Sequence, residues 1–232
     1  MIDIDYNIPS LKDLGLNEIN YDDRTAFPFK GGYNTGIERI NYYLWESKKL
    51  SFYKKTRNGL IGKDYSSKLS SWLANGSLSP RIIYHSIKDY EFKIEKNQST
   101  YWMIFELIWR DFFKYISRLN GNKIFKIGGI LEKNYHWIQD KRIFENWING
   151  KTPEPFVNAN MLELKNTGWM SNRGRQNVAS YLAKEKKIDW RWGAKYFESK
   201  LIDYDVHSNY GNWMYVSGAV SYTHLTLPTM DS

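Results

Sequence analysis

Large apolar side chains recur at helical spacing along most of this chain. Beginning near Thr35, the residues Ile37, Ile40 and Leu44 fall on one face of a helix at steps of three and four. The pattern is most regular after Ser99, where large apolar residues repeat in the same way: Trp102, Phe105, Trp109, Phe112 and Ile116. The sequence contains no run of strict two-residue alternation, so the pattern predicts helices rather than strands.

Turn signals place the other helices. Asn75-Gly76 and Ser79-Pro80 divide two short helices, and Ser79 can cap the second with Pro80 in its first turn. Further helices are expected over about 141–149, 160–166, 172–186 and 192–202, and loops over 120–140 and in the polar segment from Asp203. The expected fold class is all-α, because the strand–helix alternation of an α/β sheet is missing.

Three regions are expected along the chain. Residues 1–30 are rich in Asp, Pro and Gly and are predicted to form an extended lead-in, and residues 31–218 a helical domain. Residues 219–232 read AVSYTHLTLPTMDS and are uncharged before Asp231. One reading frame of a common sequencing adapter encodes most of this segment, so a non-native tail is expected, with a native flexible terminus as the alternative.

Composition excludes several kinds of chemistry. The 232 residues include no cysteine, which excludes disulfides, thiolate metal sites and cysteine nucleophiles. The histidines at 85, 136, 207 and 224 lack metal-site spacing, so no metal is expected. No apolar run approaches the ~20 residues of a membrane span, and the acidic start lacks a secretory signal. The net charge of +8 favours a polyanionic partner, and the 17% aromatic content suits flat ligands but also fills cores.

Three groups of residues could carry chemistry. Tyr53 with the segment Asp64–Ser70 offers hydroxyls, a cation and backbone N–H groups for a diphosphate, or simple helix caps. Glu106, Trp109 and Arg110 could bind a planar ligand, although an i,i+4 ion pair beside a core indole is the interpretation that the residues alone favour. Finally, 172–177 and 203–215 combine acids, amides and aromatic rings that would suit a polar heterocycle better than a core.

Long segments of the chain resemble the helical flavin-binding domain of the photolyase/cryptochrome family, and most closely its cryptochrome DASH branch. The resemblance covers about residues 8–218 in family order, with Gln176 and Tyr215 pointing to the DASH branch. The segments that carry it are AFPFKGG, TRNGLIGKDYSSKLSSWLANGSLSPR, STYWMIFELIWRDFFKYIS and NTGWMSNRGRQNVASYLAKEKKIDWRWGAKYFESKLIDYDVHSNYGNW.

The resemblance implies FAD as the cofactor. It assigns the ribityl-diphosphate to the first group of residues: Tyr53, Ser66, Ser67, Lys68, Leu69 and Ser70. Around the rest of the cofactor it implies Glu106, Arg110, Asn172 and Arg175, with Arg175 paired to both Asp203 and Asp205. Asn209 would face flavin N5, where a neutral amide suits a reduced anionic ring and a carboxylate would repel it.

The resemblance also implies a substrate hole and a path for electrons. Glu106, Trp109, Gln176 and Tyr215 would line the hole for a flipped pyrimidine dimer, with Glu106 on the base edge. The tryptophans that match the family's photoreduction chain from the surface to the flavin are Trp213, Trp190 and Trp147, for which three core indoles are the alternative.

The function implied is FAD-dependent, blue-light-driven repair of cyclobutane pyrimidine dimers, by a deoxyribodipyrimidine photo-lyase acting on single-stranded DNA. A non-catalytic photoreceptor cryptochrome and a flavin-free helical DNA-binding protein are the alternatives. We expect a monomer with a DNA partner and no membrane partner, in the cytoplasm of a bacterium or an organelle of a eukaryote. A folate antenna would belong to a further domain that precedes the lead-in.

Overall fold

The computed structural model of the chain describes residues 9–17, 22–133 and 135–220. Over these ranges the regular structure is helical, and the pairing of extended backbone is limited to an isolated parallel bridge between Ile138 and Ile188. This confirms the all-α fold class predicted from apolar spacing. The predicted lead-in is described only in part, and all but the first two residues of the predicted tail lie outside the described residues.

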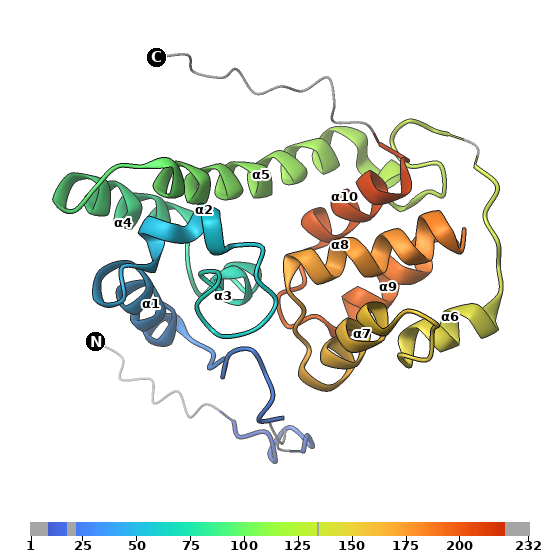
Figure 1. Cartoon of the computed structure of the whole chain (residues 1–232), viewed down its shortest axis with the longest axis horizontal. Coiled ribbons are helices and arrows are strands. Elements are labelled where there is room, and N and C mark those ends of the chain that lie inside the picture. Colours follow the sequence, from blue (N-terminus) through green and yellow to red (C-terminus); the bar gives the residue numbers. More distant parts are fainter. Residues whose placement is uncertain (1–8, 18–21, 134, 221–232) are drawn as a thin grey trace, which may run out of the picture.

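The first lobe of the molecule comprises α1 to α4 and the short turns between them (Figure 1). Its elements are α1 (Tyr33–Asn41), the π-helical turn η1 (Tyr42–Glu46), the 3-10 turn η2 (Lys49–Phe52), α2 (Tyr53–Thr56), α3 (Ser70–Ala74) and α4 (Pro80–Lys93). Ser79 caps α4 by accepting the N–H of Arg81 at 3.2 Å, and Pro80 occupies the first turn, as predicted. The predicted apolar stripe is also present, because Ile40 and Leu44 are buried.

The long helix α5 (Gln98–Asn120) runs past both lobes (Figure 1). It begins one residue before the predicted start because the Asn97 side chain accepts the N–H groups of Ser99 and Thr100 and completes a capping box. Its N-terminal half packs Met103 into one apolar core, and its C-terminal half packs Phe113 against another. One amphipathic helix therefore connects the two lobes.

The second lobe follows a 3-10 turn, η3 (Gly121–Phe125). It contains α6 (Lys141–Ile148), α7 (Pro155–Thr167), α8 (Asn172–Ser180) with the π-helical turn η4 (Tyr181–Glu185), α9 (Trp190–Lys200) and α10 (Val206–Ser217). The helix expected over 160–166 begins earlier because Pro155 fits a first helical turn. The helix expected from residue 192 begins at Trp190 because Asp189 accepts the N–H of Arg191 at 3.0 Å.

Helix α10 corrects the prediction of a polar loop from Asp203. Asn, Gly and His in this segment have weak helix propensity, but Asp205 caps the helix at the N–H of Ser208 at 2.8 Å. The helix packs closely on its neighbours, since a Cβ at Gly211 would clash with Phe113 of α5. Tertiary packing therefore overrides local propensity here.

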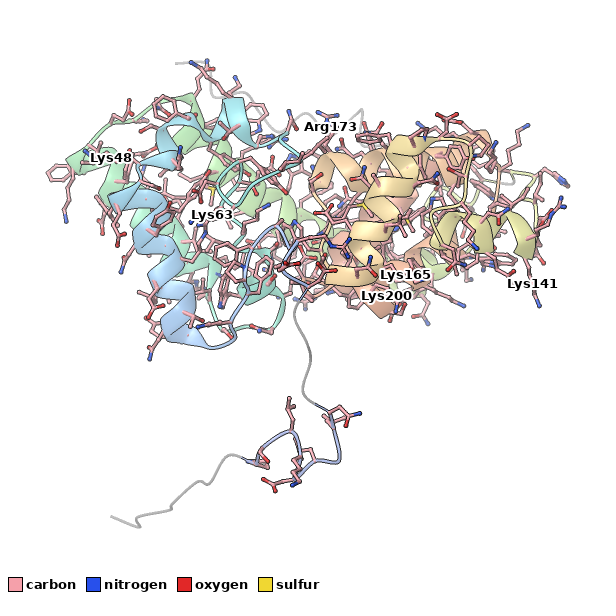
Figure 2. The ribbon with its side chains drawn as sticks, turned by 60° about the horizontal axis from the view of Figure 1, so that its bottom comes forward. Lys48, Lys63, Lys141, Lys165, Arg173 and Lys200 are labelled. Carbon is pink, nitrogen blue, oxygen red and sulfur yellow. The ribbon has the colours of Figure 1, made fainter. Side chains whose placement is uncertain are left out.

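Two apolar cores hold the lobes. The first core contains Ile40, Tyr43, Leu44, Leu50, Tyr53, Leu69, Trp72, Leu78, Ile83, Ile87, Tyr90 and Met103. The second core is larger and includes Trp147, Trp190, Phe197 and Trp213. Labelled cations lie on both lobes, including Lys48 and Lys63 on the first and Lys141 and Lys200 on the second, so the charge is spread widely (Figure 2). Among the described helices, none is long and apolar enough to cross a bilayer.

Candidate functional site

Two adjoining cavities share part of their walls, and the first of them lies where the lobes meet. The first cavity, of about 290 Å³, is lined from both lobes and from α5; the second cavity, of about 470 Å³, is lined by residues from α8 to α10. The residues that line both, which we call the shared wall, are Asn172, Arg175, Asp203, Asp205, Ser208 and Asn212. These volumes are near or within the ~300–1,000 Å³ of small-molecule sites.

The serine segment Ser66–Ser70 lines the first cavity together with Tyr53 and the shared wall. The Ser70 hydroxyl donates to Oδ2 of Asp203 at 2.7 Å, although 133 positions separate these residues in the sequence. The structure therefore brings the residues expected around the diphosphate and those expected around the ring to one cavity. Their contact with a ligand remains a prediction.

Lys68 is a buried lysine in the wall of the first cavity. It is 2% exposed, and its Nζ has no hydrogen-bond partner among the described residues. The Nζ lies 3.3 Å from the ring centroid of Tyr65 and 4.8 Å from that of Trp169. Burial lowers the pKa of Lys68 to about 7, against the opposing effect of the Glu163 carboxylate.

A buried cation that lacks an acceptor is costly, and an anion in the cavity would supply one. The hydroxyls of Ser66 and Ser67 add further donors to the same wall, whereas that of Ser70 is held by Asp203. This donor set fits the diphosphate of FAD.

Arg175 and Asp203 form the ion pair of the shared wall. The Arg175 Nη2 lies 2.9 Å from Oδ1 and 3.0 Å from Oδ2 of Asp203, and its Nε donates to the Met170 carbonyl at 2.9 Å. The predicted pair of Arg175 with Asp205 is wrong, because Asp205 caps α10 at Ser208. Each of the two carboxylates is thus already neutralised, by a guanidinium or by the positive end of a helix.

Asn209 lines the second cavity but not the first. It is 8% exposed, and its Nδ2 donates to the Ala194 carbonyl at 3.0 Å, which fixes the plane of the amide. Asn172 lies in the shared wall and is exposed. Both positions therefore line the second cavity.

Glu106 of α5 pairs with Arg57, directly after α2, rather than with Arg110. The Arg110 Nη2 instead donates to the Leu73 carbonyl at 3.3 Å. The i,i+4 ion pair that the sequence favoured is therefore wrong, because each partner has a better-placed acceptor or donor on the first lobe. Glu106, Trp109 and Arg110 all line the first cavity.

The four residues predicted for one substrate hole divide between the cavities. Glu106 and Trp109 line the first cavity, whereas Gln176 and Tyr215 line the second. The Gln176 Oε1 accepts from Nη1 of Arg173 at 3.0 Å, and Tyr215 is 55% exposed. They border the joined cavities from two sides and do not gather on one wall.

The three predicted tryptophans are all buried, with exposures of 2% for Trp213 and 0% for Trp190 and Trp147. The rings of Trp147 and Trp213 are 6.2 Å apart, and Trp190 donates to the Ile127 carbonyl at 3.0 Å. Because all three are buried, none of them can be the surface end that the predicted electron path requires.

Some residues of the site and of its surroundings were not among the predicted ones, including Trp137, which lines neither cavity. Trp137 is partly exposed and packs on the second core, and the next residue, Ile138, donates to the Lys187 carbonyl at 2.7 Å. An indole in a segment without helical spacing was the available signal. Tyr65 and Trp169, which enclose Lys68, also line the first cavity, and both occur in segments that carry the resemblance.

The cation and hydroxyls that line the first cavity suit this two-lobed helical domain to a phosphorylated cofactor. The family model for the FAD binding domain of DNA photolyase matches residues 102–231. The chain belongs to this photolyase/cryptochrome family, and its cofactor is FAD.

Named relatives agree with this assignment. Cryptochrome DASH of Synechocystis is 56% identical over 201 residues, covering 87% of this chain and 41% of the relative. A Synechocystis cryptochrome crystal structure has a TM-score of 0.87 at 54% identity and covers 91% of this chain and 43% of that one. An archaeal photolyase structure from Sulfolobus tokodaii with two FAD molecules has a TM-score of 0.66 at 26% identity. It covers 90% of this chain and 43% of that one. The chain thus spans less than half the length of these relatives.

Proposed function

We propose that the protein carrying this domain repairs cyclobutane pyrimidine dimers in single-stranded DNA under blue light, as a lyase of the cryptochrome DASH type. FAD, when bound and reduced, supplies the electron that opens the cyclobutane ring. The observation that carries the proposal is the charge balance around the two cavities. Asp203 is paired with Arg175, Asp205 caps α10, and Lys68 has the Glu163 carboxylate nearby but no hydrogen-bond partner among the described residues, so the site favours an anion.

The residues of the chain would divide the work between the two cavities. Ser66–Ser70 and Lys68 would bind the diphosphate, and Asn209 would present a neutral amide to the ring. Gln176 and Tyr215 would contact the dimer from the second cavity, and Glu106 would accept a hydrogen bond from a base edge on the α5 side. Apolar walls from Trp109 and Trp213 would exclude water from the reacting groups.

Electrons would enter at Trp137, the surface end, and pass inward through the second core by way of three buried tryptophans: Trp190, Trp147 and Trp213. The partial exposure of Trp137 supports its place at the surface, and the ring contact between Trp147 and Trp213 supports a transfer between these two. Trp137 also adjoins the backbone bridge to residues 187–189, immediately before Trp190. A monomer in a bacterial cytoplasm or an organelle, with a folate antenna on a further domain, completes the proposal.

The second candidate is a photoreceptor that signals through the redox state of its flavin, and the cryptochrome names of the relatives favour it. Both functions would use the same cofactor cavity. The two functions differ in whether a pyrimidine dimer binds to Gln176, Tyr215 and Glu106.

A repair assay separates the two functions. Reduced, FAD-loaded protein is illuminated with a dimer-containing single-stranded oligonucleotide, and loss of the dimer is followed by chromatography. We expect repair, with a loss of about tenfold or more in Glu106→Ala and none in the control Glu95→Ala, an exposed glutamate that does not line either cavity. Intact dimer beside normal photoreduction would contradict repair and favour the photoreceptor. A colourless protein would exclude both.

A further inference from the structure

Arg39 of α1 is a buried cation that lies behind the serine segment, outside the first cavity. It is 4% exposed, and its guanidinium holds the chain from Lys63 to Ser67 by several hydrogen bonds. Nε donates to the Ser67 carbonyl at 2.9 Å, and Nη2 donates to the carbonyls of Lys63 at 2.9 Å and Ser66 at 3.2 Å. Nη1 donates to the Asp64 carboxylate at 3.0 Å.

Aromatic rings and a second donor fix the same guanidinium and its counter-ion. The Arg39 Cζ lies 4.7 Å from the ring centroid of Phe27 in the lead-in and 5.2 Å from that of Tyr43. The Tyr42 hydroxyl donates to the other oxygen of Asp64 at 3.1 Å, and this bond raises the pKa of Tyr42. A planar fork of donors can reach several acceptors at once, whereas a lysine ammonium is a single point.

The direction of these bonds determines the direction of the neighbouring N–H groups. In a trans peptide the carbonyl and the following N–H point opposite ways, and these bonds are trans. Because the Ser66 and Ser67 carbonyls face Arg39, the N–H groups of Ser67 and Lys68 point away from it. In the described part of the chain, neither N–H donates a hydrogen bond.

The far side of this loop is the first cavity, which Ser66, Ser67 and Lys68 line. Lys68 has a φ of 62°, a left-handed conformation that a lysine rarely adopts without support from its surroundings. Successive N–H groups beside a left-handed residue form a concave anion site. The unpartnered Nζ of Lys68, 2% exposed, is an independent sign that an anion belongs there.

We propose that Arg39 is a positioning residue that presets the diphosphate subsite by turning the peptide groups of Ser67 and Lys68 toward the first cavity. This inference rests on the proposed cofactor function and adds a residue that touches no part of the ligand. Preset donors bind without an ordering cost, so loss of the fork should weaken diphosphate binding specifically. The lead-in contributes as well, because Phe27 covers one face of the guanidinium.

The test compares Arg39→Lys, which keeps the charge but loses the fork, with Ile87→Ala. Ile87 is fully buried in the first core and does not line the first cavity. Its variant is therefore a control that loses stability without a direct change at the cavity. The first readout is the rate of tryptic cleavage after Lys63 and Lys68 in the FAD-free chain, which rises when the segment loosens. The second is affinity for FAD and for riboflavin, which lacks the diphosphate.

For Arg39→Lys we expect about tenfold faster cleavage after Lys63 and Lys68, with cleavage in α9 unchanged, and FAD affinity about tenfold or more weaker at constant riboflavin affinity. Ile87→Ala should change neither the relative cleavage of the loop nor the ratio of the two affinities. Normal loop cleavage in Arg39→Lys, or equal losses for FAD and riboflavin, would overturn the inference. A wild-type chain that binds neither ligand would instead refute the cofactor function, and loop cleavage would still decide whether Arg39 orders the loop.

Discussion

The two lobes build their share of the site in different ways. In the first lobe the site residues lie on an irregular segment between α2 and α3, helices of four and five residues. That segment is held by bonds from one side chain, Arg39, to backbone carbonyls. In the second lobe the site residues lie on or beside α8, α9 and α10, helices of nine to twelve residues that are held by buried indoles.

The difference determines how each lobe should respond to substitution. On the second lobe, Trp213 belongs both to the cavity wall and to the apolar core, so site and stability cannot be separated. On the first lobe, Arg39 holds the site without lining it, so a polar substitution can disorder the loop while the core persists. Substitutions in each lobe, and at the contact between them, test this contrast.

The largest effect is expected for Trp147→Ala in the second core. Trp147 is fully buried, packs 6.2 Å from Phe197 and Trp213, and donates to the Val178 carbonyl at 3.1 Å. We expect about 3–5 kcal/mol of destabilisation in urea unfolding, together with loss of the second-lobe site. Trp147→Phe, which keeps a ring, should lose clearly less. Unchanged stability would refute the claim that buried indoles hold the second lobe.

The second effect concerns the contact between the lobes. Asp203→Asn keeps the shape but removes the charge that pairs with Arg175, whose side chain is 23% exposed. We expect a loss of about 2–3 kcal/mol in urea unfolding. Ser70→Ala removes only the hydroxyl bond across the lobes and should cost about 1 kcal/mol. Equal losses in both variants would mean that the ion pair contributes nothing beyond the hydroxyl bond.

Lys68→Met tests the buried cation of the first lobe through pH. The pKa of Lys68 is about 7 in the folded chain, below its value of 10.5 when exposed, because burial disfavours the charge. The unfolded chain therefore binds more protons between these values, so the cost of burial is full below pH 7 and disappears toward pH 10.5. In the absence of FAD, Lys68→Met should raise Tm at pH 6.5 and have little effect near pH 10.

The control for this titration is Lys55→Met, at an exposed position, which should show no such pH dependence. A Tm difference between Lys68→Met and wild type that stays constant from pH 6.5 to pH 10 would show that the amine is solvated in the folded chain. Conversely, FAD should bind wild type more weakly as the pH rises through 7, since the ammonium loses its proton.

The smallest effect is expected at Ser71, which is buried and whose hydroxyl has no partner among the described residues. Ser71→Ala removes this unsatisfied group and should raise stability by about 1 kcal/mol in urea unfolding. A loss of stability would indicate that the hydroxyl is satisfied in solution by water.

The sequence was informative where one helix face decides the outcome. The repeat from Trp102 to Ile116 predicted α5 nearly to its first residue, and the resemblance predicted a cofactor site whose first-lobe and shared-wall residues meet at one cavity. Pairings across elements were less predictable. Glu106 was expected to pair with Arg110 on its own helix, but Arg57 lies within reach only because α2 packs beside α5.

What the sequence determined by itself is the helical class, the family and the residue types of the site, because spacing and local motifs are properties of the chain. The tertiary structure alone decided that α10 is a helix, that Trp147 is enclosed while Trp137 reaches the surface, and that Arg39 orients the peptide groups of Ser67 and Lys68. These outcomes depend on burial and on contacts between distant segments. Such contacts exist only once the two cores have packed.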